Sequence, residues 1–421
     1  MVAVVLLAAG IVIAKDDDGE RTHGAGTALP SAAHVRGIER EVERIRGRRF
    51  KRAIAPKVVT ADQARADSLR DVDTEYPVKQ RAADGELLKL LGLIPPGADI
   101  LELLKKVSGE QIVGYYDTRR KILRLVSGNG ADSPALVDIT LAHELTHALE
   151  DQVFGLDEQG GTTDDESSAA TALNEGTATY VMDEYSQCCV DRQQLALGSL
   201  ASLAGGSTAG IPPYVERTLT FSYTAGEDFV RHLHDLTGNW SLVDVALENQ
   251  PPVSTEQIIH PDKYAPFEPP LPVKLRTRPL LGDGWTRASA GTLGELDTRE
   301  LLRLGDPGRA ASAAAGWGGN RYELWRRTGP ATADCRAPCR GRDALVVSWR
   351  WDSPAEAREF DPVLREYVEK GLKGRRAGSG VWGLDGGAVA VAGGREATTI
   401  AWAPDAALAR RLADRAPVRA R

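Results

Sequence analysis

The stretch Thr140–Gln152, TLAHELTHALEDQ, constrains the fold more than any other part of the chain, because it sets two histidines and a glutamate in an apolar run. Ser133 and Pro134 before it are typical of a helix start, and Gly155 after it is typical of a helix end. Apolar residues cover most of the circumference of this helix, so we predict that it is buried. Polar side chains on a buried helix are costly unless they share a partner.

The two histidines of this stretch have the spacing of metal ligands. His143 and His147 are four residues apart, so on a helix both imidazoles project from one face about one turn apart and can bind a single ion, which suits Zn²⁺. Glu144 adjoins the first histidine, and its carboxylate can accept a proton from a water molecule acidified by the metal. With seven histidines in 421 residues, a chance His-Glu-x-x-His is an event of order ~1 in 100. We therefore predict zinc bound by His143 and His147, with Glu144 as general base; the alternative is a core helix with incidental histidines.

A catalytic zinc requires a third protein ligand. The metzincin pattern would place a histidine at position 153, where this chain has Val153, so that type is excluded. Glu175, in LNEGTAT, follows His147 by 28 positions and lies in a predicted helix long enough to pack against the first. We expect Glu175 to complete the ligand set. The alternatives are Glu166, Asp165 and Glu184.

Several segments resemble known metallopeptidases. His143-Glu144-x-x-His147 followed by Asn174-Glu175-Gly176-x-Ala178 resembles the gluzincin arrangement, and NEGxA is similar to the glutamate-helix motif of aminopeptidases of the M1 type. EQIVGYYDTRRKILRLV, LAHELTHALEDQVFGL, LNEGTATYV, STEQIIHPDKY and GWGGNRYELW together resemble a group of exported bacterial zinc-metallopeptidase-like proteins, roughly from Glu110 to Trp325. The resemblance implies a zincin fold, one zinc ion and hydrolysis of peptide bonds.

The chain also departs from these families. The spacing between His147 and Glu175 differs from that of the aminopeptidases, and the sequence has no GxMEN-type segment for a substrate amino terminus, which argues against aminopeptidase activity. Thr179 stands where thermolysin-like enzymes have an aspartate that orients a histidine ligand, and Asp138 or Asp183 is the expected substitute.

Two further expectations concern catalysis and substrate. His260 and Tyr223 are the candidate oxyanion stabilisers, although each can instead hold a loop or the core. A predicted hairpin precedes the histidine helix, and in zincins an edge strand at this place pairs with an extended peptide. Either Ile112–Tyr115 or Ile122–Leu125 is the expected strand.

Composition narrows the remaining possibilities. A chain of 421 residues with 42% hydrophobic residues is globular and too long for one typical core. A net charge of −7 without a sustained basic stripe argues against nucleic acid as a partner, and the basic stretch Arg44–Arg52 is expected to be a solvated helix face. The first fourteen residues are apolar and are followed by KDDDGE. This pattern predicts a signal peptide or membrane anchor and an extracytoplasmic location.

The C-terminal part carries four tryptophans and two cysteines of interest. The tryptophans alternate along predicted strands, so we expect core positions rather than a groove. They are Trp317, Trp325, Trp349 and Trp351. Cys335 and Cys339 can close a small disulfide loop in an exported protein, whereas Cys188 and Cys189 are interpreted as plain helix residues, because a bridge between neighbours is strained.

We therefore predict an α+β protein, in which a zincin-like catalytic domain is followed by a smaller α+β domain. The catalytic domain combines a helical lobe, a hairpin or small sheet and the histidine helix. The predicted boundaries are 1–15 for the signal or anchor segment, 16–33 for a flexible tether, 34–109 for the helical lobe, 110–265 for the catalytic core, 266–273 for a proline-rich linker and 274–421 for the C-terminal domain. The predicted function is zinc-dependent hydrolysis of a peptide or protein substrate. The alternative is a zincin-fold module that keeps the metal for stability and works by binding, with the C-terminal domain as its recognition surface.

Overall fold

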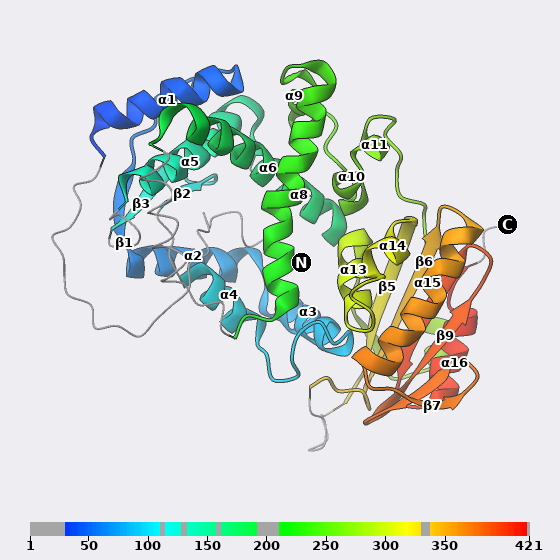
Figure 1. Cartoon of the computed structure of the whole chain (residues 1–421). Coiled ribbons are helices and arrows are strands. Elements are labelled where there is room, and N and C mark those ends of the chain that lie inside the picture. The colour runs from blue at the N-terminus through cyan, green and yellow to red at the C-terminus, as the bar shows by residue number, and fades with distance from the viewer. Residues whose placement is uncertain are drawn as a thin grey trace.

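The computed structural model describes residues 30–109, 114–127, 133–156, 161–191, 210–329 and 337–418. The described chain opens with α1 (Ala32–Arg46), β1 (Lys57–Thr60), α2 (Ala61–Glu75), α3 (Val78–Leu90), α4 (Ile100–Gly109), β2 (Gly114–Asp117) and β3 (Ile122–Ser127). It continues with α5 (Pro134–Phe154), α6 (Asp164–Cys189), α8 (Pro213–Thr237), α9 (Ser241–Glu248), α10 (Thr255–Ile259) and α11 (Pro261–Tyr264) (Figure 1). The predicted signal or anchor segment 1–15 lies outside the described residues. Among the described helices, none combines the length and apolar character that a membrane span requires.

The helix with the two histidines forms as its sequence predicts. The Ser133 side chain accepts the backbone N–H of Leu136, Pro134 occupies the first turn, and Gly155 ends α5 in the left-handed region with φ 76°. The face toward α1 and the small sheet is apolar and belongs to one hydrophobic cluster with them. Helix α5 is therefore held on several sides, which fixes the direction of its polar side chains.

The small sheet has the strand order β1-β3-β2. Strands β2 and β3 form the predicted antiparallel hairpin, and β1 adds to the outer side of β3 in parallel. The central position of β3 contradicts the expectation that Ile122–Leu125 could pair with a peptide, because both of its edges are occupied. Strand β2 is an edge strand and packs against α5.

Helices α6 and α8 approach each other unusually closely through two glycines. A Cβ built on Gly176 would lie 2.1 Å from the backbone carbon of Gly226, and one built on Gly226 would lie 2.0 Å from the carbonyl oxygen of Ala172. Only glycine is compatible with contacts of this length, so the glycine of the NEG segment is explained by packing. The close crossing fixes the position of α6 along the axis of α8.

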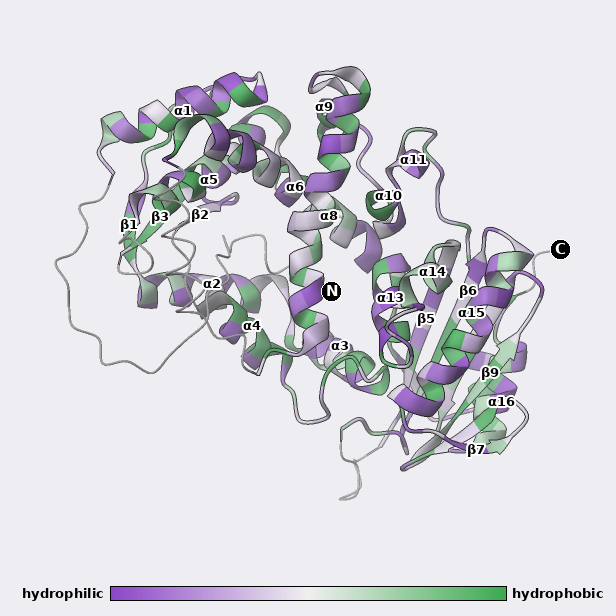
Figure 2. Cartoon of the chain, viewed as in Figure 1, coloured by the Kyte–Doolittle hydropathy of each residue, from purple (hydrophilic) through white to green (hydrophobic). Residues whose placement is uncertain are grey.

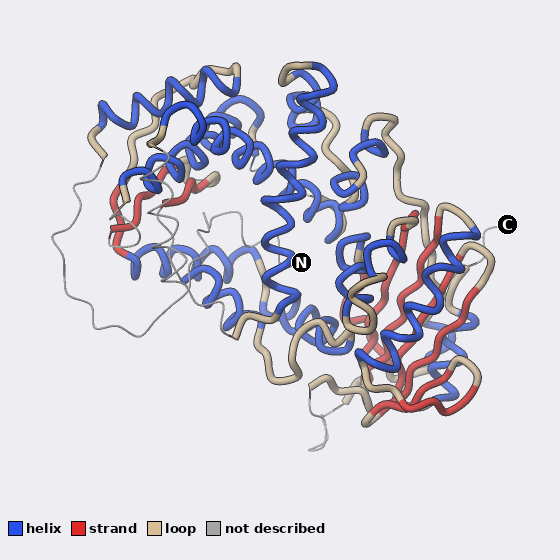
Figure 3. The backbone as a smooth tube through the Cα atoms, viewed as in Figure 1, coloured by secondary structure: helices blue, strands red, loops and turns tan. Residues whose placement is uncertain are grey.

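The C-terminal part is a second α+β unit. It contains α12 (Arg278–Leu281), β4 (Trp285–Gly291), α13 (Gly294–Arg303), α14 (Ala310–Ala314), β5 (Trp317–Arg327), β6 (Asp343–Trp351), α15 (Pro354–Glu366), the π-helical turn η3 (Tyr367–Gly371), β7 (Arg375–Gly378), β8 (Val381–Leu384), β9 (Gly387–Gly393), β10 (Ala397–Ala403) and α16 (Ala406–Arg415). The strands form one antiparallel sheet in the order β4-β5-β6-β10-β9-β8-β7, flanked by helices (Figure 3). The α+β class is as predicted.

Both faces of this sheet are covered. Alternate residues of β6, such as Val347 and Trp349, join a core with α13, α14 and α15, whereas Ala344 and Val346 face α16. Helix α15 accordingly carries both hydrophobic and hydrophilic residues (Figure 2). The four tryptophans are at most 7% exposed, which confirms that they are core residues.

The helical lobe shares its core with the C-terminal sheet. Leucines of α3 and α4 belong to the same hydrophobic cluster as the α15 face of the sheet, and the Tyr367 hydroxyl donates to the Leu91 carbonyl at 2.9 Å. The helical lobe near the N-terminus therefore packs against the C-terminal domain, a contact that its local sequence did not predict.

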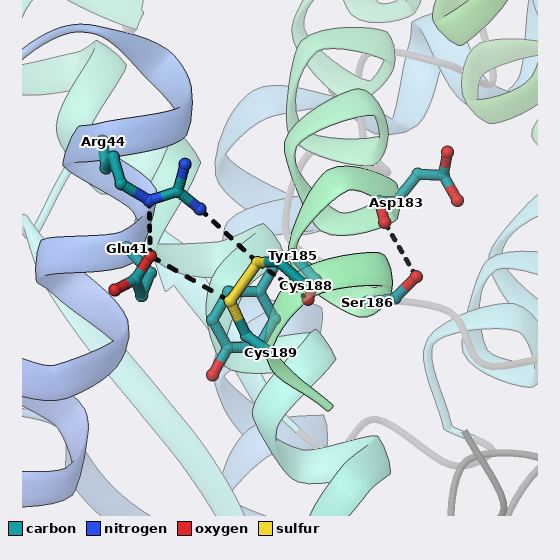
Figure 4. Close-up of a disulfide and its surroundings, with 7 residues drawn as sticks. All are labelled: Glu41, Arg44, Asp183, Tyr185, Ser186, Cys188 and Cys189. Atoms are coloured by element: carbon teal, nitrogen blue, oxygen red, sulfur yellow. Dashed lines mark hydrogen bonds and ion pairs between the residues drawn. A yellow bond between two sulfur atoms is a disulfide. The ribbon is translucent and has the colours of Figure 1, made fainter. Parts of the chain in front are cut away.

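The adjacent cysteines correct one expectation. Cys188 and Cys189 form a disulfide at the end of α6, beside Glu41 and Arg44 of α1 (Figure 4). The bridge is compatible with the helix because it joins the last two residues of α6, and the next residue, Val190, is already extended. Cys339 is disulfide-bonded as well, while the predicted partner Cys335 lies outside the described residues.

Candidate metal centre

Helices α5 and α6 bring three ligand atoms together. His147 Nε2 lies 3.1 Å from His143 Nε2, and Glu175 Oε2 lies 3.2 Å from His143 Nε2 and 3.6 Å from His147 Nε2. Ligands of a tetrahedral zinc, at roughly 2.0–2.1 Å from the ion, are about 3.3 Å apart. The three atoms therefore have the spacing of three corners around one zinc ion.

Hydrogen bonding alone does not account for this triangle. A ring nitrogen carries either a proton or a lone pair, so His143 Nε2 can donate to Glu175 or accept from His147, but it cannot do both. All three residues are at most 7% exposed, so a polar atom left without a partner is costly there. A cation at the centre satisfies all three lone pairs at once, and the donor set of two imidazoles and a carboxylate suits zinc.

The charges of these groups are strongly coupled. Burial lowers the pKa of His147, but the Glu175 carboxylate outweighs this effect and raises the pKa to about 9. Burial raises the pKa of Glu175, and His147 and His143 more than reverse it, so that the pKa falls to about 2. Glu175 is thus an anion at neutral pH, the form in which a carboxylate binds a metal.

The carboxylate of Glu144 is held by the small sheet. Its Oε2 accepts the backbone N–H of Tyr116 in β2 at 2.7 Å. Burial raises the pKa of this carboxyl, and the neighbouring histidines only partly oppose the effect. Glu144 is not a member of the ligand group, as expected for a base rather than a ligand.

The alternative ligands are placed elsewhere. Glu166 caps α6, where its carboxylate accepts the Thr163 N–H, and Asp165 accepts from Thr255. Among the described residues, the metal-binding group around His143 includes neither of these acids, nor Glu184. Glu175 is the acid that the fold brings to the histidines.

The two acids expected to orient His143 or His147 pair with other residues. Asp138 pairs with His34 at 2.7 Å, and Asp183 pairs with Arg231 at 3.2 Å. Both predictions fail because residue spacing along a helix does not say which neighbouring element packs over a side chain.

A buried ion pair behind the ligands was missed by sequence reasoning. Glu150, one turn after His147, is fully buried and accepts from Arg46 Nε at 2.7 Å. Asp244 lies 2.7 Å from the same guanidinium, which also stacks over the Trp240 ring at 4.3 Å. Arg46 is 0% exposed, although the sequence predicted a solvated helix face here. The sequence did contain a clue to this ion pair, because Glu150 is an acid on a helix predicted to be buried.

The candidate oxyanion stabilisers have different locations. Tyr223 of α8 lies beside the centre, with its ring centroid 6.0 Å from that of His143. His260 lies against α13 instead, where its Nε2 is 3.1 Å from Glu295 and 3.5 Å from Arg299. The structure brings Tyr223, and not His260, to the ligands.

The outer edge of β2 lies at the same place. Tyr116 uses its N–H for Glu144 rather than for β3, so this N–H points out of the small sheet. Backbone groups repeat their direction every second residue, and Gly114 therefore points its N–H and carbonyl the same way. Among the described strands, β2 pairs only with β3, so its outer edge beside Glu144 has no strand partner there; Ile112 and Val113 lie outside the described residues.

The fold and site thus define an α+β protein with a buried candidate centre of two histidines and a glutamate. Residues 280–413 match the family model of a domain of unknown function, DUF8575. This match covers the C-terminal sheet and does not reach the candidate centre. Comparison with curated proteins gave no match, and neither did comparison with solved structures.

Proposed function

We propose that this protein is a zinc-dependent peptidase of gluzincin type. The observation that carries the proposal is the triangle of His143, His147 and Glu175 next to a glutamate that is not a ligand. An exported location, secreted or anchored by the N-terminal segment, belongs to the same proposal and rests on the apolar first fourteen residues.

The roles of the side chains follow from their positions. The triangle would hold the ion, and bound zinc supplies Lewis acidity, which acidifies water and polarises a carbonyl group. Glu144 accepts the proton: the Tyr116 N–H holds one carboxylate oxygen, and the raised pKa makes the group a stronger base. The hydroxyl of Tyr223 is the candidate donor to the developing oxyanion.

The substrate is an extended peptide bound along the open edge of β2. Backbone pairing with an edge strand supplies affinity without regard to sequence. The outward groups of Gly114 lie two residues before Tyr116, whose N–H holds the base. A peptide paired there runs past Glu144, which brings a backbone carbonyl to the ligand triangle.

The second candidate function is a binding module with a structural metal, and such a site would be expected to have more protein ligands than a catalytic one. Structural zinc sites are closed by four side chains, whereas catalytic sites keep one position open. Within the described residues, the group has three members, and Glu144 is held apart by Tyr116. Both features support the enzyme.

The test is cleavage of a complex peptide mixture by the full chain, read by mass spectrometry. Three matched samples are compared: the native protein, Glu144→Gln, and chelated protein with and without added zinc. We expect cuts that disappear in Glu144→Gln and after chelation and that return with zinc. A protein shown to hold one zinc ion per chain and to make no cuts would instead support the binding module.

A further inference from the structure

A cavity of ≈ 840 Å³ lies where three parts of the chain meet, away from the ligand triangle. Its walls come from the turn after α3, the start of α8 and the C-terminal domain, and the floor is formed largely by leucine, isoleucine and proline side chains. This volume lies within the range of ligand sites. The charged residues of the lining are Lys89, Arg217, Arg340, Lys373, Arg375 and Asp385.

The charge of this cavity opposes that of the whole chain. Five of these residues are cations and one is an acid, in a protein with a net charge of −7. Arg217 is paired with Glu300, and Arg340 donates to the backbone carbonyl of Asp385 at 3.3 Å. Even when Glu300 and Asp385 are both counted against the five cations, an excess of positive charge remains.

Several of these donors have no ion-pair or hydrogen-bond partner within the part of the chain that the structure describes. No ion pair joins Lys89, Lys373 or Arg375 to a described residue, and Arg340 Nε is buried without a hydrogen-bond partner there. Lys373 is also held at φ 57°, a conformation that residues with side chains rarely adopt. Cations gathered around one cavity create a positive potential, which favours the binding of an anion there.

We propose that this cavity binds an acidic segment of the peptide substrate. The cations recognise carboxylates, and the apolar floor accepts a hydrophobic side chain between them. Lys373, Arg375 and Arg340 come from the region that matches the domain of unknown function, whereas Lys89 and Arg217 come from the helical part. The site is therefore built jointly, which gives the C-terminal domain a role in substrate choice.

One helix, α8, contributes residues both to this cavity and to the surroundings of the candidate metal centre. The inference that the ligand is part of a substrate rests on the proposed peptidase function. Arg217 and Tyr223 both lie on α8, six positions apart, which corresponds to about 9 Å along the helix axis. An extended peptide advances roughly 3.3 Å per residue. The cavity would therefore select acidic residues at substrate positions outside the scissile bond itself.

The experiment measures binding separately from cleavage. A fluorescein-labelled peptide that alternates glutamate and leucine is titrated with full-length protein carrying Glu144→Gln, at about 0.15 M salt to screen distant charges. The test variant adds Lys89→Gln, Lys373→Gln and Arg375→Gln. The control adds Lys57→Gln, Lys79→Gln and Arg358→Gln, which remove the same charge from exposed positions outside the cavity.

We expect the test variant to weaken the Kd for the peptide at least about tenfold and the control less than about twofold, with both variants keeping the parental melting temperature. Equal weakening would overturn the proposal, and so would displacement of the peptide by inorganic phosphate at equal concentration, which would indicate a site for a small free anion. In the catalytically intact background, the test changes should raise KM for an acidic substrate and leave kcat unaltered. If the three substitutions left cleavage of the acidic substrate unchanged, this inference alone would be wrong. If the peptide bound tightly but was never cleaved, the proposed peptidase function would be wrong.

Discussion

At the scale of single residues, Glu175 supplies both a candidate ligand atom and the negative charge that raises the pKa of His147. The change Glu175→Gln keeps the size of the side chain and removes its negative charge. We expect the Kd for zinc to weaken by more than the roughly 10–100-fold that loss of an outer-shell partner costs. Isothermal titration checks this, with Glu184→Gln on the same helix as the control. Equal affinities in the two variants would show that Glu175 is not a ligand.

Proton release is a second consequence of the charges at the centre. The pKa of His147 is about 9 in the metal-free protein, so this imidazole is protonated at pH 7 and must lose its proton before it can bind zinc. We expect zinc binding at pH 7 to release about one proton, and the apparent affinity to rise with pH until it levels off above pH 9. Calorimetry in two buffers that differ in ionisation enthalpy measures the proton count. Heats that are independent of the buffer would contradict the prediction.

The sequence predicted which three residues come together better than it predicted the groups around them. The i, i+4 spacing places His143 and His147 on one face wherever α5 lies, so this part of the site is local. Glu175 was expected from its place in a second helix long enough to pack against α5, and the resemblance of NEGxA to a known motif supported the choice. Arg46 and the roles of Asp138 and Asp183 depend on which helix packs over which, and such contacts between distant segments leave no periodic signal in the sequence.

At the scale of helices and strands, the crossing of α6 and α8 controls the position of Glu175. In Gly226→Ala the new Cβ would lie 2.0 Å from the Ala172 carbonyl oxygen, so the helices must separate and carry the ligand with them. We expect the variant to lose about 1–3 kcal/mol of unfolding free energy and to bind zinc more weakly. Urea denaturation and zinc titration provide the two measurements.

The matched control for this crossing is Gly37→Ala in α1. Its new Cβ meets only the end of the flexible Arg40 side chain at 4.0 Å, so higher helix propensity should stabilise the protein by roughly 0.5–1 kcal/mol. If both alanines stabilised the protein, the close crossing would not be a constraint.

The open edge of β2 gives another prediction at this scale. Gly114→Pro removes an outward N–H, whereas Gly114→Ala keeps it and adds the same crowding, because a Cβ there lies 2.9 Å from the Arg124 carbonyl oxygen. We expect proline to lower kcat/KM for peptides at least roughly tenfold relative to alanine, with zinc content unchanged, since one backbone hydrogen bond to the substrate is lost. Equal activity of the two variants would exclude backbone pairing at Gly114.

The elements themselves were largely predictable, and their pairing was not. The caps of α5 and the hairpin β2-β3 follow from neighbouring residues. The pairing of β1 with β3 joins Lys57 to Arg124 across a long stretch of chain, and it decides which strand keeps a free edge. No local pattern carries that information, which is why Ile122–Leu125 remained a candidate until the sheet order was known.

At the scale of the whole molecule, the shared core of the helical lobe and the C-terminal sheet makes the chain one cooperative unit. A cluster that runs from α3 and α4 to the α15 face of the sheet cannot open on one side without exposing apolar surface on the other. We therefore expect the metal centre and the C-terminal sheet to unfold at the same urea concentration. Seven of the eight tryptophans lie after residue 274, so fluorescence reports the sheet, while a chromogenic chelator reports release of zinc.

The variant that tests this coupling is Tyr367→Phe. It removes the buried hydroxyl that donates to the Leu91 carbonyl and leaves that acceptor unmet, at a cost of about 1–3 kcal/mol. Both midpoints should fall together, because the lost bond joins the C-terminal domain to the helical lobe. In the control Arg376→Gln, which removes an exposed ion pair with Glu369, neither midpoint should move by a comparable amount. Separate midpoints in the native protein, or a shift of the fluorescence midpoint alone in Tyr367→Phe, would mean that the two halves fold independently.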